Sequence, residues 1–350
     1  MFKTIILISS DQLKDERTIQ AIYHILQGKK SIQTIQDAYL YQLSTYYGIL
    51  PSLKQSFFNQ TIQDLVNDGY LEPSKTYDHS YTITKEGRQA IKKEVFPEML
   101  SFLHGRKYGA QGIRFEQRVL LFVQVLSNKQ VNNMNYVPVI DDYAVKNDIK
   151  QIFRQLQSSS AALSEQFFKE CHDLLSPIDH QYALLFVQRF SGYKQYGMSL
   201  QQLSQSVRQP EIDILIIYRS IIHYMMRKIR LDASKYPLLS LMYPEDDNTQ
   251  LTITARQTKS FVDQGYNLEE IATHRNLKLN TIYDHIVEIA LIDASFLIDS
   301  FIHEEEIATI LQTVHSLQTY QLRELKEALG EEYSYFQIRL ALARGGTMNG

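Results

Sequence analysis

The sequence has little cysteine and no long apolar segment. Its single cysteine, Cys171, excludes an internal disulfide framework and any zinc or iron–sulfur site built from several cysteines. We expect Cys171 to act as a small apolar residue on a helix. The longest clean apolar run near the start, residues 5–8, is too short for a membrane span or the core of a signal peptide. The sequence therefore predicts no membrane contact and a cytoplasmic location.

Motifs of catalytic chemistry are also lacking. The sequence has no HExxH or DxDxDG spacing, and the serine triplet at residues 158–160 lacks the glycine-flanked turn of a nucleophile. The glycine-rich stretch at residues 105–112, GRKYGAQG, is not followed by the Lys-Ser or Lys-Thr pair of a phosphate-binding loop. We expect it to be a joint between two domains. The sequence predicts no enzyme, no catalytic residue, no cofactor and no metal site.

Apolar residues recur mainly with the period of a helix, and this sets the expected fold class. With 350 residues and 44% hydrophobic content, the chain can bury a substantial core and should hold two or three domains. We expect a mainly α protein made of a winged-helix domain at residues 1–95, a helical middle domain at residues 105–235 and a helix-turn-helix domain at residues 250–350.

The expected winged helix begins with three amphipathic helices and ends with a hairpin. Ile19, Ile22, Tyr23 and Leu26 form one apolar face, and Gly28 should end that helix. Ser31 is a candidate N-cap for the second helix, and Gly69 should stop the third. Residues 70–84 then read as two strands joined by a polar turn. This order, closed by Tyr-x-x-Thr-x-x-Gly, resembles winged-helix regulators of bacteria.

Residues 254–292 follow the order of a helix-turn-helix unit. Apolar residues fall at helical spacings, while Gly265 and the pair Arg275-Asn276 lie where the chain must turn. In such a unit, the start of the last helix enters the major groove of DNA. These apolar positions are Phe261, Leu268, Ile271, Ala272, Leu277, Ile282, Ile286 and Ile289.

A faint repeat of this pattern lies earlier in the chain, because residues 199–225 align without gaps on the segment that begins at Asn267. Two readings stay open: a degenerate second helix-turn-helix, or two helices that share a common packing period. The positions Leu200, Leu203, Ile214 and Ile221 match Leu268, Ile271, Ile282 and Ile289.

The stretch from residue 254 to residue 343 resembles the helix-turn-helix region at the C-termini of RecQ-family helicases. The matching pieces are a threonine-led first helix, the glycine before LEEIATHRNLKLNTIYDHI, and the closing LRELKEALGEEYSYFQIRLALA. The whole layout, with no helicase motor before this region, is similar to the YpbB-type proteins of Gram-positive bacteria. The resemblance implies a DNA-binding accessory protein that works with a RecQ-like helicase in DNA repair and recombination.

Charge is distributed unevenly along the chain. Residues 1–95 carry 11 basic and 10 acidic side chains (+1), residues 96–235 carry 17 and 12 (+5), and residues 236–350 carry 8 and 17 (−9), which accounts for all 36 basic and 39 acidic residues. Because affinity for nucleic acid depends largely on neutralised phosphates, the C-terminal third should bind DNA weakly unless its cations share one face.

The candidate DNA contacts follow from this organisation. The third helix of the winged helix supplies one cation and several amides that can bond to adenine edges, and the wing region supplies two cations for the flanking phosphates. A second set lies at the equivalent place in the C-terminal domain. The candidates are Lys54, Gln55, Ser56, Asn59, Gln60, Gln63, Lys85 and Arg88, with Arg275, Lys278, Asn280, Thr281 and Tyr283 in the second set.

Two other functions fit the same sequence. A free-standing transcription regulator would be a two-fold oligomer on an operator with two half-sites, although the sequence has no heptad segment for dimerisation. A protein-interaction adaptor would have no affinity for DNA, and the charge of −9 in the last third favours it.

Overall fold

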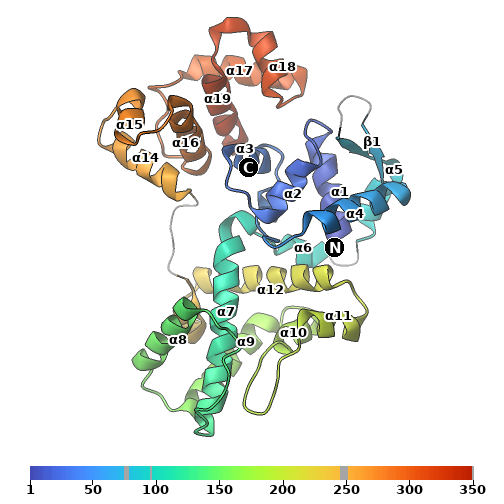
Figure 1. The fold of residues 1–350 in the computed structure, drawn as a ribbon, viewed down its shortest axis with the longest axis vertical. Coiled ribbons are helices and arrows are strands. Elements are labelled where there is room, and N and C mark those ends of the chain that lie inside the picture. The colour runs from blue at the N-terminus through green and yellow to red at the C-terminus, as the bar shows by residue number, and fades with distance from the viewer. Residues whose placement is uncertain (75–78, 95–96, 245–250, 349–350) are drawn as a thin grey trace. The chain divides into compact units, whose positions relative to one another are not determined.

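The computed structural model describes residues 1–74, 79–94, 97–244 and 251–348 (Figure 1). These residues form nineteen α-helices, two short strands and two turns of 3-10 helix. The mainly α class expected from the sequence is confirmed.

The chain forms two compact units. The middle unit consists of residues 1–2 and 94–245, and the terminal unit consists of residues 3–93 and 246–350. The expected winged-helix and helix-turn-helix segments thus share one unit, although they lie at opposite ends of the sequence. The division into three domains stays a prediction, because one compact unit can hold two domains.

The terminal unit contains the two strands and eleven of the α-helices within its described residues. Its elements are α1 (Phe2–Leu13), α2 (Gln20–Gln27), α3 (Ile32–Leu40), η1 (Ser44–Tyr46), α4 (Gln55–Asn67), β1 (Leu71–Pro73), β2 (Tyr81–Ile83), α5 (Lys85–Lys92), α14 (Ile253–Asp263), α15 (Leu268–His274), α16 (Leu279–Ile292), α17 (Glu304–Leu317), α18 (Leu322–Leu329), η2 (Gly330–Glu332) and α19 (Tyr335–Met348).

The winged helix forms where the sequence places it. Helix α2 ends at Gly28, whose φ of 71° lies in the left-handed region that favours glycine. Ser31 caps α3, because its side chain accepts a hydrogen bond from the backbone N–H of Thr34. Strands β1 and β2 pair antiparallel with Leu71 opposite Ile83. Part of the expected polar turn between them, residues 75–78, lies outside the described residues.

Helix α16 is the centre of the C-terminal part of this unit. It packs against α14, α15 and α19, and also against α3 of the winged helix. Ile282 and Ile286 are fully buried in this core. Gly265, with a φ of 88°, makes the turn between α14 and α15, and Asn267 caps α15 in a reciprocal capping box with Glu270. The expected helix-turn-helix is therefore present.

The middle unit is helical throughout its described residues. Its elements are α6 (Pro97–Ser101), α7 (Gly105–Gln130), α8 (Tyr143–Gln155), α9 (Ser160–Leu175), α10 (His180–Val187), α11 (Leu200–Val207), α12 (Glu211–Leu231) and α13 (Pro237–Met242).

The glycine-rich segment at residues 105–112 is not a joint, so this expectation was wrong. It forms the first turns of α7, the longest described helix. A Cβ atom at Gly112 would lie 3.2 Å from atoms of Ile222 and His223 on α12. The missing side chain therefore lets α7 and α12 approach closely, and this packing outweighs the low helix propensity of glycine.

The faint repeat has the local geometry of a second helix-turn-helix. Ser199 and Gln202 form a capping box at the start of α11, at the positions that Asn267 and Glu270 occupy at the start of α15. Arg208, with a φ of 53°, makes the turn into α12. The corresponding residue before α16, Asn276, has a φ of 50°. Of the two readings left open by the sequence, the structure supports the degenerate helix-turn-helix.

Candidate nucleic-acid interface

Helix α4 presents a polar face to solvent. Its opposite face is held in the winged-helix core by Phe58, Ile62 and Leu65, which are all buried. This amphipathic pattern leaves the remaining positions free of core packing. All six candidates on or just before this helix are exposed: Lys54, Gln55, Ser56, Asn59, Gln60 and Gln63.

The amides on this face make only exposed hydrogen bonds. Gln55 Nε2 donates to Gln20 Oε1 at 3.2 Å, and Gln60 Nε2 donates to Asp64 Oδ1 at 2.9 Å. The side chain of Asn59 makes no hydrogen bond to the described residues. Because such bonds already compete with water, exchanging them for bonds to base edges costs little. The face can therefore act as a set of donors and acceptors.

The wing region adds two exposed cations. Lys85 begins α5, and Arg88 lies one turn later on the same helix. The Arg88 guanidinium pairs with Asp11 of α1, with Nη2 and Oδ1 3.0 Å apart. Both partners are largely exposed, so this pair contributes little stability and can be exchanged for a phosphate.

The C-terminal candidates divide into two groups, of which the first is accessible. Lys278 and Asn280 are exposed at the start of α16, and Thr281 is half-buried beside them. Lys278 is the N-cap residue of this helix, without a side-chain capping bond. This group offers one cation and two polar side chains.

Arg275 belongs to the second group, because its guanidinium is used within the fold. It donates to Thr254 O at 2.8 Å, to Gln257 Oε1 at 2.9 Å and to Thr258 Oγ1. Its Nη1 also lies 3.4 Å from Nδ1 of His285. Burial, with a contribution from this arginine, lowers the pKa of His285 to about 4, so the ring is neutral at pH 7. Arg275 therefore ties α14 to the turn between α15 and α16.

Tyr283 is likewise used in packing. Its ring stacks on Phe336 of α19, with centroids 4.3 Å apart and an interplanar angle of 18°. The neighbouring Asp284 accepts a hydrogen bond from Arg339 Nη1 at 2.6 Å, and Arg339 Nε donates to Gln36 Oε1 of α3 at 3.1 Å. Tyr283 and Asp284, on the side of α16 that would face a groove, therefore contact α19 instead, and Arg339 connects Asp284 to α3 of the winged helix. The sequence could not show this, because the partner helices are far away along the chain.

A second polar contact joins the two parts of the terminal unit. Arg17 Nε donates to Asp37 Oδ1 at 2.9 Å, and its Nη2 donates to Tyr320 O at 3.5 Å. Glu16 Oε2 accepts from the backbone N–H of Tyr320 at 2.9 Å. Burial raises the pKa of the Asp37 carboxyl, and the positive charge of Arg17 opposes that shift. The winged helix and the C-terminal helices are therefore joined by paired polar groups as well as by apolar packing.

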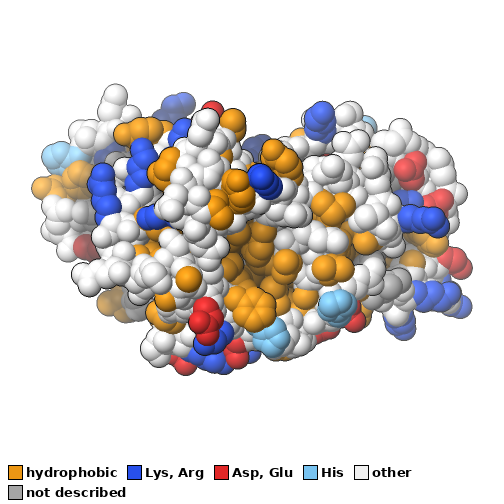
Figure 2. All heavy atoms as spheres, turned by 90° about the horizontal axis from the view of Figure 1, so that it is seen from below, with side chains coloured by type: hydrophobic (Ala, Val, Ile, Leu, Met, Phe, Trp, Pro, Cys, Tyr) orange, Lys and Arg blue, Asp and Glu red, His pale blue; other side chains and the backbone are white. Residues whose placement is uncertain are grey.

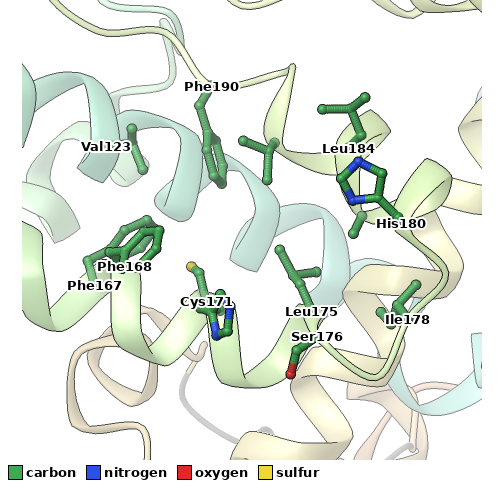
Figure 3. A pocket seen from close by; sticks show the side chains of 13 residues that line it. Val123, Phe167, Phe168, Cys171, Leu175, Ser176, Ile178, His180, Leu184 and Phe190 are labelled. Atoms are coloured by element: carbon green, nitrogen blue, oxygen red, sulfur yellow. The ribbon is translucent and has the colours of Figure 1, made fainter.

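The middle unit has an apolar pocket that contains none of the candidate DNA contacts. It has a volume of about 540 Å³ and lies between α7, α9 and α10 (Figure 3). On the face of the molecule seen in Figure 2, hydrophobic side chains gather around a hollow. Phe168 and two histidines, His172 and His180, line the pocket.

The single cysteine, Cys171, is buried on α9, and this burial raises the pKa of its thiol. Its burial on a helix confirms the expected role as a small apolar residue.

Comparison with known families identifies the class of both terminal segments. Residues 5–101 match the RQC domain, and residues 254–342 match a helix-turn-helix domain. These two domains are the RecQ C-terminal architecture. The sequence resemblance led us to expect a RecQ-type domain only at the C-terminal end, whereas the N-terminal segment was compared with winged-helix regulators of bacteria. No helix among the described residues is long and apolar enough to cross a membrane. The same residues contain no group of three or more His, Cys, Asp or Glu side chains placed to hold a metal ion.

The chain is also similar to a known protein over nearly its whole length. It is 29% identical to Protein YpbB of Bacillus subtilis (strain 168) over 349 residues, which cover 98% of this chain and 97% of the relative. No solved structure matches. The resemblance to YpbB-type proteins is therefore confirmed, and the two domains support a DNA-binding role.

Proposed function

We propose that this chain is a non-catalytic DNA-binding accessory protein that works with a RecQ-like helicase in DNA repair or recombination in the cytoplasm of a Gram-positive bacterium. The RQC and helix-turn-helix domains support a nucleic-acid role, and the chain has no sequence motif of a helicase motor. Because the chain has no such motif, the proposed accessory role requires a partner helicase that supplies the energy of unwinding.

The exposed face of α4 is the observation that carries the DNA-binding proposal. Its amides and Lys54 are accessible, whereas Arg275 and Tyr283 of the second candidate set are held in packing contacts. In a winged helix, the helix before the hairpin is the one that can enter a major groove. Amide side chains there bond to base edges, while Lys54, Lys85 and Arg88 meet phosphates.

A triple substitution tests this assignment. Fluorescence anisotropy would compare binding to labelled duplex, forked and single-stranded DNA across a salt series. We expect Gln55→Ala, Asn59→Ala and Gln60→Ala together to weaken binding by about 10-fold or more, since each base contact contributes roughly 1–3 kcal/mol. The matched control removes two exposed amides of α11 with Gln201→Ala and Gln205→Ala, and should leave affinity unchanged. Equal loss in both variants would contradict the proposal.

The helicase partnership has its own test. A purified RecQ-like helicase would be assayed for unwinding of forked DNA with and without this protein, at a helicase concentration below saturation. We expect the protein to increase the rate of unwinding and to form a complex with the helicase in size-exclusion chromatography. If the protein binds DNA but neither binds nor stimulates the helicase, the DNA-binding proposal holds and the helicase partnership is contradicted.

An adaptor role is the second candidate, and two observations favour it. The last third of the chain has a net charge of −9, which repels phosphate, and two of its five candidate contacts are used inside the fold. If the full chain does not bind any of the three DNA forms at low salt, the adaptor becomes the better account of both domains.

A further inference from the structure

A second cavity in the middle unit combines an apolar floor with a basic rim. It has a volume of about 390 Å³ and lies between the end of α7, helix α8 and the segment at residues 131–142. Leu121, Val125 and Ile149 contribute apolar side chains to it. A space of this size accepts one large apolar side chain.

Four cations surround this cavity. Lys146, Lys150 and Arg154 are spaced by four residues along α8, so they share one face of that helix, and Lys129 comes from the end of α7. Among the described residues, only Lys146 of these four pairs with an acid, which is the exposed Asp141 at 2.7 Å. The rim therefore keeps a local excess of positive charge.

An aromatic ring connects the rim to the core beneath it. Phe153 of α8 stacks on the fully buried Phe122, with centroids 5.0 Å apart, and Lys129 Nζ lies 4.8 Å from the centroid of the Phe153 ring. The ring of Phe153 is half-buried and held by these two contacts, and its accessible part lines the cavity.

The wall formed by the segment after α7 is fixed by two buried amides. Gln124 Nε2 donates to Val137 O at 3.0 Å, and Gln124 Oε1 accepts from the backbone N–H of Val139 at 2.7 Å. Asn128 Oδ1 accepts from Asn133 Nδ2 at 2.7 Å. Because these bonds hold the segment across α7, the cavity is formed before any partner arrives, which lowers the entropic cost of binding.

We propose that this cavity is a docking site for an acidic peptide segment of a partner protein, with one apolar side chain of the peptide inserted between α7 and α8. The carboxylates of the peptide pair with Lys129, Lys150 and Arg154, which line the cavity and have no acidic partner among the described residues.

A nucleotide would fit this cavity less well than a peptide. Its base would place polar edge groups against Leu121, Val125 and Ile149, which offer no hydrogen-bond partner.

Peptide binding to the full chain tests this proposal. The probes are fluorescein-labelled decapeptides of Asp, Glu and Gly, each with one central Phe, Leu or Trp, together with a matched peptide carrying Ala at the centre. Lys150→Ala with Arg154→Ala is the test variant, because both side chains are exposed and their loss should leave the fold intact. Lys29→Ala with Lys30→Ala removes the same charge from another exposed site and serves as the control.

We expect binding of at least one peptide with an apolar centre, a loss of about 10-fold in the test variant, and no loss in the control. The Ala-centred peptide should bind about 10-fold more weakly, because the cavity stays unfilled. Absence of binding, equal binding of the Ala-centred peptide, or equal loss in both variants would overturn the proposal. So would tighter binding of an oligo-dT decamer that depends on the same two cations, since it would make nucleic acid the occupant.

This outcome is independent of the DNA-binding face. Substitution of Gln55, Asn59 and Gln60 lies in the terminal unit and should leave peptide binding unchanged. A failure of DNA binding and a failure of peptide binding are therefore separate results.

Discussion

The two helix-turn-helix segments share a backbone plan but use the second helix differently. Both begin with a capping box and turn through a residue of positive φ, Arg208 in one and Asn276 in the other. At the start of α12, Asp213 accepts a hydrogen bond from the backbone N–H of Phe2. At the start of α16, Lys278 and Asn280 are exposed. The same local fold therefore presents an acidic, occupied surface in one unit and a partly open surface in the other.

This difference shows that a helix-turn-helix pattern does not by itself identify a DNA-binding helix. In both segments, the second helix is mostly buried by neighbouring helices. The surface that remains depends on those neighbours and not on the turn. Function has to be argued from the exposed side chains. All six candidates on or just before α4 of the winged helix are exposed, whereas only Lys278 and Asn280 of the five C-terminal candidates are.

The largest effect should come from the matched core positions Leu203 and Ile271, which are both fully buried. Leu203→Ala and Ile271→Ala should each lower the free energy of unfolding by about 2–5 kcal/mol, because each leaves a cavity in its core. Urea denaturation followed by circular dichroism would measure both. A loss below about 1 kcal/mol in one of them would show that the two segments are not packed in equivalent ways.

Acidification should weaken both second helices through their buried histidines. Burial lowers the pKa of His223 on α12 to about 3 and that of His285 on α16 to about 4, from the ordinary value of 6.5. The unfolded state therefore binds protons first as the pH falls below 6.5. Above pH 6.5 both rings are neutral in the folded and the unfolded state, and the fold has its full stability. As the pH falls below 6.5, the free energy of unfolding decreases by at most about 1.4 kcal/mol per pH unit for each histidine. This loss continues to about pH 3 for His223 and to about pH 4 for His285.

The histidine variants isolate this pH effect. Asn can replace the Nδ1 acceptor of either ring, so His223→Asn and His285→Asn should each show a shallower loss of stability between pH 7 and pH 5 than the unsubstituted chain. Urea midpoints at these two pH values would give the comparison. Parallel pH dependence in the variants and the unsubstituted chain would mean that both rings are protonated in the fold at pH 5.

Arg275 marks a place where the two segments differ, because the matching residue before α12 is Val207. Arg275→Ala should cost about 1–3 kcal/mol of unfolding free energy, since it removes the hydrogen bond from the guanidinium to the fully buried Thr258 hydroxyl as well as its bonds to Thr254 O and Gln257. The exposed Lys278→Ala should change stability by less than about 0.5 kcal/mol. Thermal denaturation of the two variants would separate a packing residue from a surface residue, and equal stability would reverse this assignment for Arg275.

The capping boxes should have a smaller and similar effect. Ser199→Ala and Asn267→Ala each remove the side chain that caps a short helix, and each should cost about 0.5–2 kcal/mol. Ser199→Asn and Asn267→Ser keep a capping oxygen and should restore most of the loss. If only one of the two alanine variants is destabilised, the two capping boxes have the same geometry but do not contribute equally to the free energy of unfolding.

The smallest effect should come from the turn residues. Arg208→Gly should stabilise the fold by up to about 1 kcal/mol, because a left-handed backbone is costly for arginine. Asn276→Gly should give a smaller gain, since asparagine tolerates this region. Differential scanning calorimetry would resolve the order of the two gains, and a larger gain at Asn276 would contradict it.

Local features were predictable from the sequence because they depend on residues close together in the chain. The helix stops at Gly28 and Gly69, the Ser31 cap and the hairpin follow from local rules and are all present. The error at residues 105–112 had a tertiary cause, because Gly112 allows the close contact with α12. For the same reason, sequence could not foresee the packing of Arg275 and Tyr283.

The basic-rimmed cavity was also missed, although part of its signal is local. The spacing of Lys146, Lys150 and Arg154 could have suggested a basic helix face. Its apolar floor and its fixed wall depend on α7 and on the bonds of Gln124, which only the fold brings together. The exposure of the candidates on α4 followed from amphipathic spacing alone.

Charge reversal on the two candidate surfaces is the most direct test of the central claim that α4 binds DNA. Lys54→Glu and Lys278→Glu change the same charge at the exposed N-cap residues of α4 and α16. Affinity for forked DNA would be measured by anisotropy over a salt series. We expect a loss of about 10-fold or more for Lys54→Glu and of less than about 3-fold for Lys278→Glu. A larger loss for Lys278→Glu, or no loss for either, would contradict the claim.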